Sequence, residues 1–476
     1  MDTFTSSQNT LKSSGIASTW PLLLTTAIVS TNFSIIVVNM PFLSTLIWPG
    51  DPFHAVEMGG VIAIKTWILA LSGILFGTFA DRFSRKHQFF FSTVLLGLSY
   101  VGNGFIPEGQ GNVSYLLLMI CQGVAGFAVG ARNPLMQSYI NDKVEVSHRS
   151  QFFGIDMALQ QFFMVLGMIL STFIFQWGYW RWLFWGIGFL IIIGGIFIYF
   201  FIEEPKRGSK MKHLKGVLTQ GTTQYNYRIN KQTLKSTMLS RTNIIALVEG
   251  ISTRMAIGMT LFLIINYMQL EKNIAASSTG IFMSLFGLPG ALVGNLAFAR
   301  LSDRLGRKDL RYRTYLIAFS ILFLEGCFAL IFFLPLPVLT IDQGLNFRFL
   351  MSNTIFWILG ILLFGQRMVQ GIYWINQSPI LQKINLPEAQ GKITAWNQFL
   401  ERIGNGIGPL FAGALLMWTA NNFQITALVC ILVGLPGTIV WLIANKTITQ
   451  DVQTIEDILE SRASELVSKE NEDRII

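Results

Sequence analysis

The decapeptide GTFADRFSRK, residues 77–86, lies between two long apolar runs and is nearly repeated as ARLSDRLGRK at residues 299–308. Both copies contain an Asp-Arg pair followed, after two residues, by an Arg-Lys pair. Each copy comes after the second apolar run of one half of the chain. The recurrence of a charged motif at equivalent places predicts that the chain is a tandem repeat of two similar bundles.

The composition indicates that these bundles lie in a membrane. Of the 476 residues, 52% are hydrophobic and 13% are charged, whereas soluble domains carry about 25% charged residues. The net charge of +9 is explained by Lys and Arg in loops on the cytoplasmic side. No basic stripe with interleaved aromatic residues occurs outside the apolar runs, so we expect no nucleic-acid partner.

Long apolar runs predict an all-α integral membrane protein with twelve transmembrane helices in two six-helix bundles. A helix needs about 20 apolar residues to cross the hydrocarbon core. By that measure the predicted spans are residues 20–46, 57–79, 88–106, 113–140, 151–174, 182–202, 243–268, 278–300, 314–336, 354–382, 392–418 and 424–445. The runs are too long and continuous to be the strands of a membrane barrel.

The loops between the spans predict the orientation of the chain. Loops rich in Lys and Arg, such as 81–87 and 303–313, alternate with loops such as 107–112 that contain none. Basic loops stay in the cytoplasm, so we expect a plasma-membrane protein with both termini in the cytoplasm. The predicted organisation is an N-terminal bundle (1–202), a basic cytoplasmic linker (203–242), a C-terminal bundle (243–445) and an acidic cytoplasmic tail (446–476).

The two decapeptides resemble the signature loop of the major facilitator superfamily, G-x-L-A-D-R-x-G-R-K. The resemblance implies a transporter whose two bundles rock about a central site, with the signature loops latching the bundles together on the cytoplasmic side. The residues to which it gives this gating role are Gly77, Asp81, Arg82, Arg85, Lys86, Asp303, Arg304, Arg307 and Lys308. Ser84 and Ala299 stand where the family pattern has Gly. Small Gly77 is expected to permit close helix approach.

Span ten carries a second motif of the same superfamily, R-x-x-Q-G, as Arg367, Gln370 and Gly371. In many proton-driven members this Arg belongs to the coupling machinery. Span four keeps the Gln-Gly part of the motif but has Met119 at the place of the Arg. The resemblance therefore leaves the standard proton mechanism open.

Two further stretches are similar to the Spinster-type branch of the superfamily. They are EEPKRG, residues 203–208, and TNIIALVEG, residues 242–250. That resemblance implies lipid-like or amphipathic cargo. The branch usually has an Asp-Arg pair in span one, whereas span one of this chain has no charge at residues 31–42.

Charged residues within the spans indicate a central aqueous cavity. They are Lys65, Arg132, Asp156, Glu249, Arg254, Glu325, Arg367, Glu401 and Arg402. Each costs roughly 2.5–3.5 kcal/mol when unpaired at the bilayer centre, so most must be paired or in contact with water. At about 1.5 Å per residue, Arg132, Glu249, Arg254 and Glu401 lie about 12–20 Å from the cytoplasmic helix ends. Lys65 is deeper, and we expect it to extend to the outer surface.

These residues and their polar neighbours form the predicted substrate and coupling site: Asn32, Asn39, Arg132, Asn133, Glu249, Arg254, Arg367, Gln370, Asn376 and Glu401. The spacing of Glu249 and Arg254 places them on different helix faces, so each is expected to meet a partner on another helix. Interhelical salt bridges remain an alternative role for the charged members. Cations outnumber anions in the spans, which favours a small-molecule substrate with an anionic group, and Glu249 is the first choice for a coupling proton.

Three functions remain open from the residues alone: a secondary active transporter, a uniport facilitator, and a membrane receptor or sensor. An enzyme is disfavoured because the histidines (His54, His87, His148 and His213) all fall in loops, and no Walker motif is present. The three cysteines lie in apolar runs without a CxxC spacing, so neither a metal nor a cofactor is predicted. Substrate, protons and membrane lipids are the expected partners.

Overall fold

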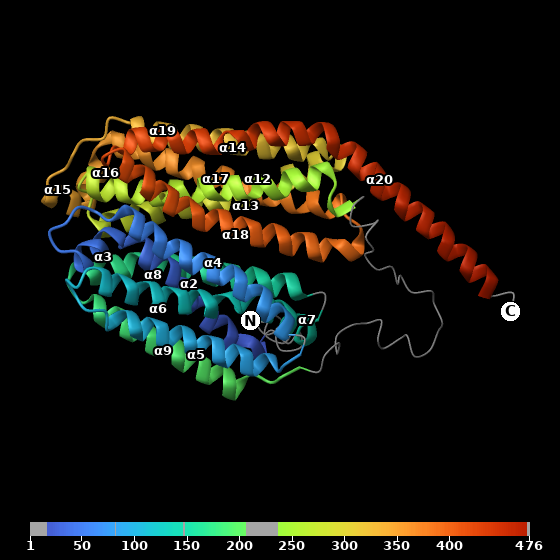
Figure 1. The fold of residues 1–476 in the computed structure, drawn as a ribbon, viewed down its shortest axis with the longest axis horizontal. Helices are drawn as coiled ribbons and strands as arrows, with labels where there is room; N and C mark the ends of the chain where they lie inside the picture. The colour runs from blue at the N-terminus through green and yellow to red at the C-terminus, as the bar shows by residue number, and fades with distance from the viewer. Residues whose placement is uncertain (1–16, 81, 146–147, 206–236, 474–476) are drawn as a thin grey trace, which may run out of the picture.

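The chain forms two helical halves that lie side by side (Figure 1). The structure is a computed structural model that describes residues 17–80, 82–145, 148–205 and 237–473. Asp81 and most of the predicted linker, 206–236, lie outside the described residues.

The N half contains η1 (Ala17–Thr19), α2 (Trp20–Val38), α3 (Met40–Ile47), α4 (Ala55–Ala80), α5 (Arg85–Gly104), α6 (Asn112–Gly130), α7 (Arg132–Lys143), α8 (Arg149–Gln176) and α9 (Trp180–Phe201). The C half contains α12 (Arg241–Asn266), η4 (Tyr267–Glu271), α13 (Ala276–Lys308), α14 (Arg311–Phe333), α15 (Ile341–Leu345), α16 (Phe347–Ser352), α17 (Thr354–Lys383), α18 (Pro387–Trp418), α19 (Phe423–Gly434) and α20 (Pro436–Asp473). In the described part of the chain, ten helices are long and apolar enough to cross a membrane. The less apolar α5 and α18 complete the twelve crossings of the predicted fold.

Three crossings that the apolar runs predict as continuous helices are interrupted. The breaks fall at Asn39, Ala131 and Leu435. Each lies shortly before a proline, namely Pro41, Pro134 and Pro436. A proline has no N–H to donate to the preceding turn, and its ring clashes with that turn, so each of these helices is weakened where it breaks.

The opposite deviation occurs at the second charged decapeptide and in the tail. The chain after the predicted span 278–300 was expected to form a basic loop, but the residues up to Lys308 are the last turns of α13. The acidic tail, predicted to begin at residue 446, continues the last crossing without a break as α20. Ile455 of this helix is buried and Leu459 is partly buried in a cluster with the C half, whereas the side chain of Leu466 lies outside the described residues.

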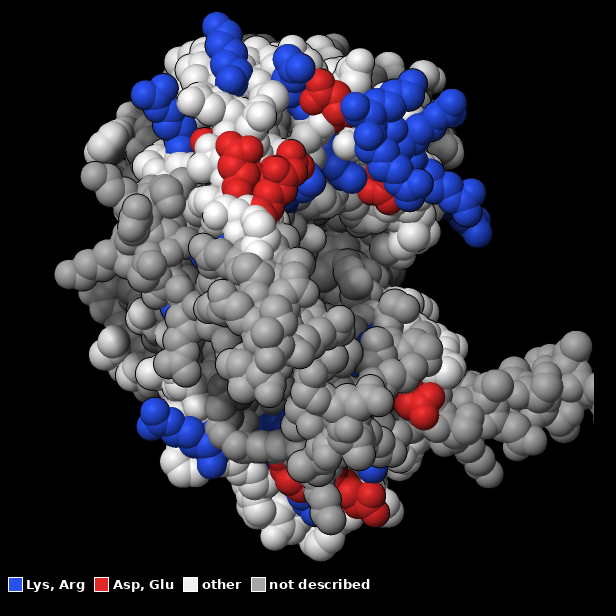
Figure 2. All heavy atoms as spheres, turned by 90° about the vertical axis from the view of Figure 1, so that its right-hand side faces the viewer, with Lys and Arg blue, Asp and Glu red and all other residues white. Residues whose placement is uncertain are grey.

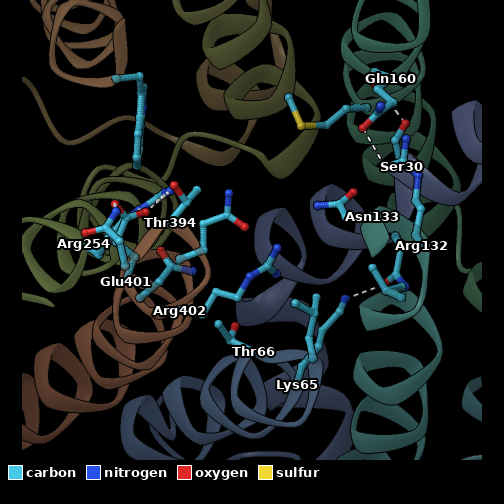
Figure 3. Close-up of a pocket in the computed structure, with 18 of the residues that line it drawn as sticks. Ser30, Lys65, Thr66, Arg132, Asn133, Gln160, Arg254, Thr394, Glu401 and Arg402 are labelled. Carbon is cyan, nitrogen blue, oxygen red and sulfur yellow. Dashed lines mark hydrogen bonds and ion pairs between the residues drawn. The ribbon is translucent and has the colours of Figure 1, made fainter. Parts of the chain in front are cut away.

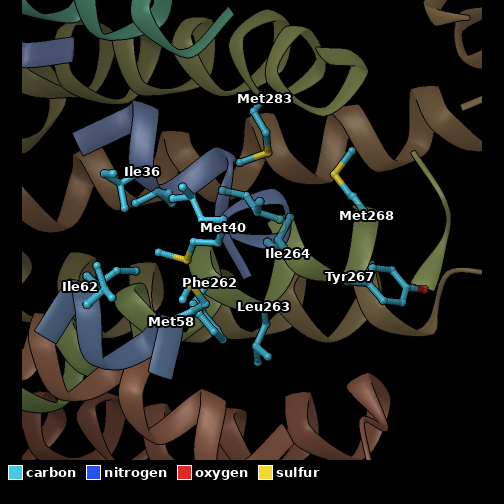
Figure 4. Packing of buried hydrophobic residues seen from close by; sticks show 14 of the residues in the cluster. Ile36, Met40, Met58, Ile62, Phe262, Leu263, Ile264, Tyr267, Met268 and Met283 are labelled. Carbon is cyan, nitrogen blue, oxygen red and sulfur yellow. The ribbon is translucent and has the colours of Figure 1, made fainter. Parts of the chain in front are cut away.

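The two halves share one hydrophobic core at the end of the molecule that carries α3, α15 and α16. Met40 and Met58 of the N half belong to the same buried cluster as Phe262 and Met283 of the C half (Figure 4). At the other end each half has its own cluster. We call the end with the shared core the closed end, and the end where each half has its own cluster the open end.

Glycines in α18 allow the halves to approach closely. A Cβ at Gly406 would collide with the Trp67 ring of α4, and one at Gly413 would collide with the backbone at Ala55. Within the C half, Gly404 packs in the same way on the backbone of α12. The Gly-rich stretch of α18 therefore packs tightly on both α4 and α12. A hydrogen bond from Trp67 Nε1 to the Ile403 carbonyl, 3.1 Å long, also joins α4 to α18.

Candidate functional site

A cavity of about 630 Å³ lies between the two halves. Its walls come from α2, α4, α6, α7 and α8 of the N half and α12, α17 and α18 of the C half. The lining extends to Thr394 near the start of α18, and the end-on view shows the molecule hollowed between the halves (Figure 2). The cavity collects predicted site residues from both repeats, namely Asn32, Arg132, Asn133, Arg254 and Glu401.

Arg132 enters the cavity as one member of a paired network in the N half. It begins α7, and its guanidinium contacts both carboxylate oxygens of Asp156 at 3.2 Å and the Gln160 side-chain oxygen at 2.7 Å. Thr26 of α2 donates to Asp156 as well, at 3.0 Å. Asp156 is therefore the partner that compensates Arg132, because an embedded cation of this kind is costly without one.

Lys65 contradicts the expectation that it extends to the outer surface. Its side chain is 7% exposed, lines the cavity and donates a hydrogen bond through Nζ to Asn32 Oδ1 (Figure 3). Residue counting gives depth along a helix but not the side-chain direction, and α4 turns Lys65 toward α2. The amide of Asn32 is neutral, so this contact satisfies a donor of Lys65 without compensating its charge.

The C half presents an ion pair between Arg254 of α12 and Glu401 of α18. Two guanidinium nitrogens, Nε and Nη2, contact Glu401 Oε2 at 3.0 and 2.9 Å. Asn397, one turn earlier in α18, donates to Glu401 Oε1 at 2.6 Å. The Arg254 guanidinium also lies 3.5 Å from the centre of the Trp374 ring. The expectation that Arg254 meets its partner on another helix is confirmed.

Arg402 is the remaining cation of the cavity wall. It points into the same space as Lys65 from the opposite half (Figure 3). Among the described residues, no hydrogen bond or ion pair to its guanidinium is formed. With Arg132 and Arg254 matched by Asp156 and Glu401, Lys65 and Arg402 leave the cavity with uncompensated positive charge.

Glu249 lies behind the cavity wall and does not line it. It is 2% exposed between α12, α17 and α20. It accepts hydrogen bonds from the Thr253 hydroxyl and from the Tyr373 hydroxyl, the latter at 3.1 Å. Its neighbour Gly250 faces the Glu401 side chain. Both donors are neutral, so this carboxyl group has no cation in direct contact among the described residues.

Arg367 and Gln370 lie in a second pocket of about 450 Å³ that adjoins the cavity. The Arg367 guanidinium donates to the Gln370 side-chain oxygen at 3.0 Å. Arg254, Trp374, Gln161 and Met164 line both spaces. The apolar wall of the second pocket contains four methionines: Met157, Met164, Met168 and Met283. Such side chains adapt to ligands of different shape.

Besides Glu249, two predicted site residues lie away from both spaces. Asn39 sits at the break between α2 and α3, where its side chain donates to the Ile35 carbonyl and to Ser171. Asn376 accepts from Arg313 at 3.2 Å and donates to Ser302 at 3.1 Å. These contacts connect α17 to α13 and α14, so Asn376 contributes to the packing of the C half.

The first charged decapeptide is held within the N half. Arg85 is 1% exposed and contacts Asp142 of α7 at 2.7 Å and Glu204, just after α9, at 3.2 Å. Partial burial acts to raise the pKa of Glu204, but hydrogen bonds from the Lys86 and Arg85 backbone, the Ser84 hydroxyl and the Arg85 side chain outweigh it and lower that pKa. Arg82 is exposed.

The close approach that Gly77 was expected to permit occurs elsewhere on α4. A Cβ added at Gly77 would lie 4.0 Å from Pro134, an ordinary contact. The tight crossing is formed by Gly126 and Gly130 of α6, which leave no room for a Cβ against α4. A span-end position is therefore less constrained than the crossing point itself.

The second decapeptide forms a corresponding network in the C half. Asp303 pairs with Arg313 of α14 at 2.8 Å. Arg313 also donates to the Ile375 carbonyl at 3.4 Å, an oxygen whose usual partner in α17 is missing because Pro379 has no N–H. The partners seen for Arg85, Lys86 and Asp303 all lie in their own halves, so the latch between halves stays a prediction. Arg304, Arg307 and Lys308 are exposed.

Several cavity residues were not singled out by the sequence reasoning. Asn397 and Asn405 lie four residues before and after the predicted Glu401, and Gln160 lies four residues after Asp156. Polar residues at this spacing share one helix face, so the signal was present in the sequence. No comparable pattern distinguishes the stacking residue Trp374.

Comparisons with known proteins agree with this architecture. The family model described as Major Facilitator Superfamily matches residues 22–341 and 244–464. The shikimate transporter of Escherichia coli is 22% identical over 75% of this chain and 77% of its own. A putative metabolite transport protein of Haemophilus influenzae is 35% identical over 18% of this chain and 22% of its own. A crystal structure of a bacterial homologue of the human lysosomal transporter Spinster, inward-facing and unoccupied, has a TM-score of 0.67 at 14% identity, covering 93% of this chain and 98% of the other.

Proposed function

We propose that this chain, which belongs to the major facilitator superfamily, carries a small organic anion across the membrane by alternating access. Solute transport is common to its relatives, and the finer assignment rests on the cavity. Lys65 from the N half and Arg402 from the C half place uncompensated positive charge on opposite walls. These two cations without a carboxylate partner are the observation that carries the proposal, because a substrate carboxylate between them could pair with both and neutralise one unit of the charge.

The arrangement of the halves supports alternating access. A shared core and the α4–α18 crossing close one end, while separate cores leave the cavity accessible from the other. Because the open end carries the basic helix termini, we assign it to the cytoplasm of a plasma-membrane protein. In the opposite state that end would close, and Asp303 would then be placed to meet the facing half.

One of the relatives supports an anionic substrate. The protein from Escherichia coli that matches most of the chain is a shikimate transporter, and shikimate carries a carboxylate. The methionine-lined pocket beside the cavity supports an apolar part in the substrate, as the Spinster-type similarity implies.

Uptake into liposomes tests the proposal. The purified protein is reconstituted, and the entry of labelled alicyclic and aromatic carboxylates is compared with that of their neutral amides. We expect saturable uptake of carboxylates that other carboxylates inhibit and amides do not. Equal uptake of acid and amide would overturn the anion assignment, and saturable binding without flux would favour the receptor or sensor.

We further propose that Glu249 carries a coupling proton. A carboxyl group buried among neutral donors is costly to ionise, and Glu249 lies directly behind the Arg254–Glu401 pair through Gly250. The Glu249→Gln variant is expected to lose accumulation driven by a pH gradient while it keeps exchange of labelled for unlabelled substrate.

The matched control for this prediction is Glu325→Gln, which also removes a buried carboxyl group but lies against α19. It is expected to keep both gradient-driven accumulation and exchange. Gradient-driven accumulation by Glu249→Gln at the wild-type level would show that the chain couples elsewhere or works as a uniport facilitator.

A further inference from the structure

The open end of the C half contains a third cavity, separate from the central one. It has a volume of about 550 Å³ and lies between the end of α13, the start of α14, the end of α17 and α20. None of its lining residues lines the central cavity. The second charged decapeptide supplies part of its wall, and no role in solute binding accounts for it.

The charged residues of this cavity leave it positive. Its cations are Arg307, Lys308, Arg313 and Lys383. Arg313 is matched by Asp303 at 2.8 Å, and Lys383 is matched by Glu456 of α20 at 2.9 Å. The other lining carboxylate, Asp309, is matched by Arg311 at 3.0 Å.

Arg307 and Lys308 remain as the unmatched cations of this wall. In the described part of the chain neither side chain forms a hydrogen bond or an ion pair. Both are exposed, and Lys and Arg side chains gather over this half in the end-on view (Figure 2). Two free cations beside a cavity of this size suit a ligand with a compact negative charge.

The rest of the lining indicates the chemistry of the ligand. Leu310, Pro379, Ile448 and Val452 form the apolar part of the lining. None of the lining residues is aromatic, so the cavity offers no ring on which a nucleotide base could stack. A lining that combines unmatched cations with aliphatic side chains matches a phosphate group that carries an aliphatic body.

The position of the cavity favours a membrane source for that group. Tyr312 and Tyr315, which flank the lining residue Arg313 in the first turns of α14, are 44% and 50% exposed. Exposed tyrosines near the ends of spanning helices mark the level of the lipid headgroups. The cavity therefore opens at the depth where lipid phosphates lie, and on the assignment above this is the anionic cytoplasmic leaflet.

We propose that this cavity binds the phosphate group of an anionic membrane lipid. Arg307 and Lys308 contact the phosphate, and the apolar part of the lining contacts the glycerol and the first methylenes of the chains. Because the walls come from α13, α14, α17 and α20, a bound lipid connects these four helices at the open end. The chemical class is a phosphodiester with a net negative charge, such as phosphatidylglycerol.

Lipid binding to the full-length protein tests this proposal. The wild type and an Arg307→Gln/Lys308→Gln variant are titrated with phosphatidylglycerol in phosphatidylcholine, and retained lipid and melting temperature are measured by native mass spectrometry and thermal denaturation. We expect the variant to bind phosphatidylglycerol about 25-fold more weakly, roughly fivefold for each cation. Equal binding and equal thermal shifts in both proteins would overturn the proposal.

The control is Arg300→Gln/Lys446→Gln, which removes two exposed cations outside the cavity and is expected to bind like the wild type. If the Arg307/Lys308 variant does not fold, Thr449→Glu, which adds a negative charge to the exposed rim of α20, is expected to weaken binding. Unchanged binding by that variant would count against the site. In a last measurement, inorganic phosphate is added to the protein in detergent. A rise in melting temperature as large as that with phosphatidylglycerol would show that the site binds free phosphate and not a lipid.

Discussion

Replacement of Lys65 with Gln is expected to raise the half-saturating concentration of organic-anion uptake roughly 10- to 100-fold. A hydrogen bond to a charged group contributes about 1.5–3 kcal/mol, and the substrate carboxylate would lose such a bond. Arg402→Gln is expected to act in the same direction. Initial rates of uptake into liposomes over a range of substrate concentrations give the measurement.

The same two variants are expected to unfold at the wild-type temperature or above it. Lys65 and Arg402 have no anionic partner in direct contact among the described residues, so their removal relieves an unfavourable buried charge. Weaker uptake without a lower melting temperature would indicate a role in substrate binding, because removal of a cation that holds the fold together would lower the melting temperature. The control is Arg132→Gln, which strands Asp156 and is expected to lower the melting temperature.

A loss of stability in Lys65→Gln together with unchanged uptake kinetics would contradict this account. That outcome would place Lys65 in the packing of the N half, where its bond to Asn32 joins α4 to α2. The substrate would then have to be neutral or to bind elsewhere.

Sequence reasoning was most successful where a physical constraint acts on composition. Charged residues inside spans must be paired or in contact with water, and Arg132, Arg254 and Glu401 indeed meet partners at the cavity. It was least successful for side-chain direction. Lys65 points inward and Asn376 points toward Arg313. Depth along a helix follows from counting, but the face that meets a neighbour depends on how the helices pack.

Helix continuity was a second limit of the sequence reasoning. Pro41, Pro134 and Pro436 were visible in the chain, yet the apolar runs that contain them were long enough to be taken as single spans. At the charged motif that ends at Lys308 the error was the reverse: its polarity suggested a loop, but the residues are helical. Arg and Lys are good helix formers, and cations at the end of α13 also complement its dipole.

The Arg254–Glu401 pair is expected to give the largest loss of stability of any single contact in the cavity. In Arg254→Gln the Glu401 carboxylate keeps only the bond from Asn397 and is left buried, which costs about 3 kcal/mol or more. Glu401→Gln should cost less, because Arg254 is partly exposed and still rests on the Trp374 ring. Unfolding in mixed micelles with increasing dodecyl sulfate measures both.

The double variant Arg254→Gln/Glu401→Gln distinguishes the interaction between the two side chains from the contacts that each makes with other residues. Because two neutral amides replace two charges, neither residue is left as an uncompensated charge, and the double variant is expected to recover most of the stability that Arg254→Gln loses. The coupling energy of the cycle should then reach about 1–3 kcal/mol. Additive losses would mean that the two side chains are stabilised independently, by Trp374 and by Asn397. Recovery of stability without recovery of uptake would show that the charge of Arg254 serves the substrate, since the double variant retains the fold but lacks the cation at the junction of the two spaces.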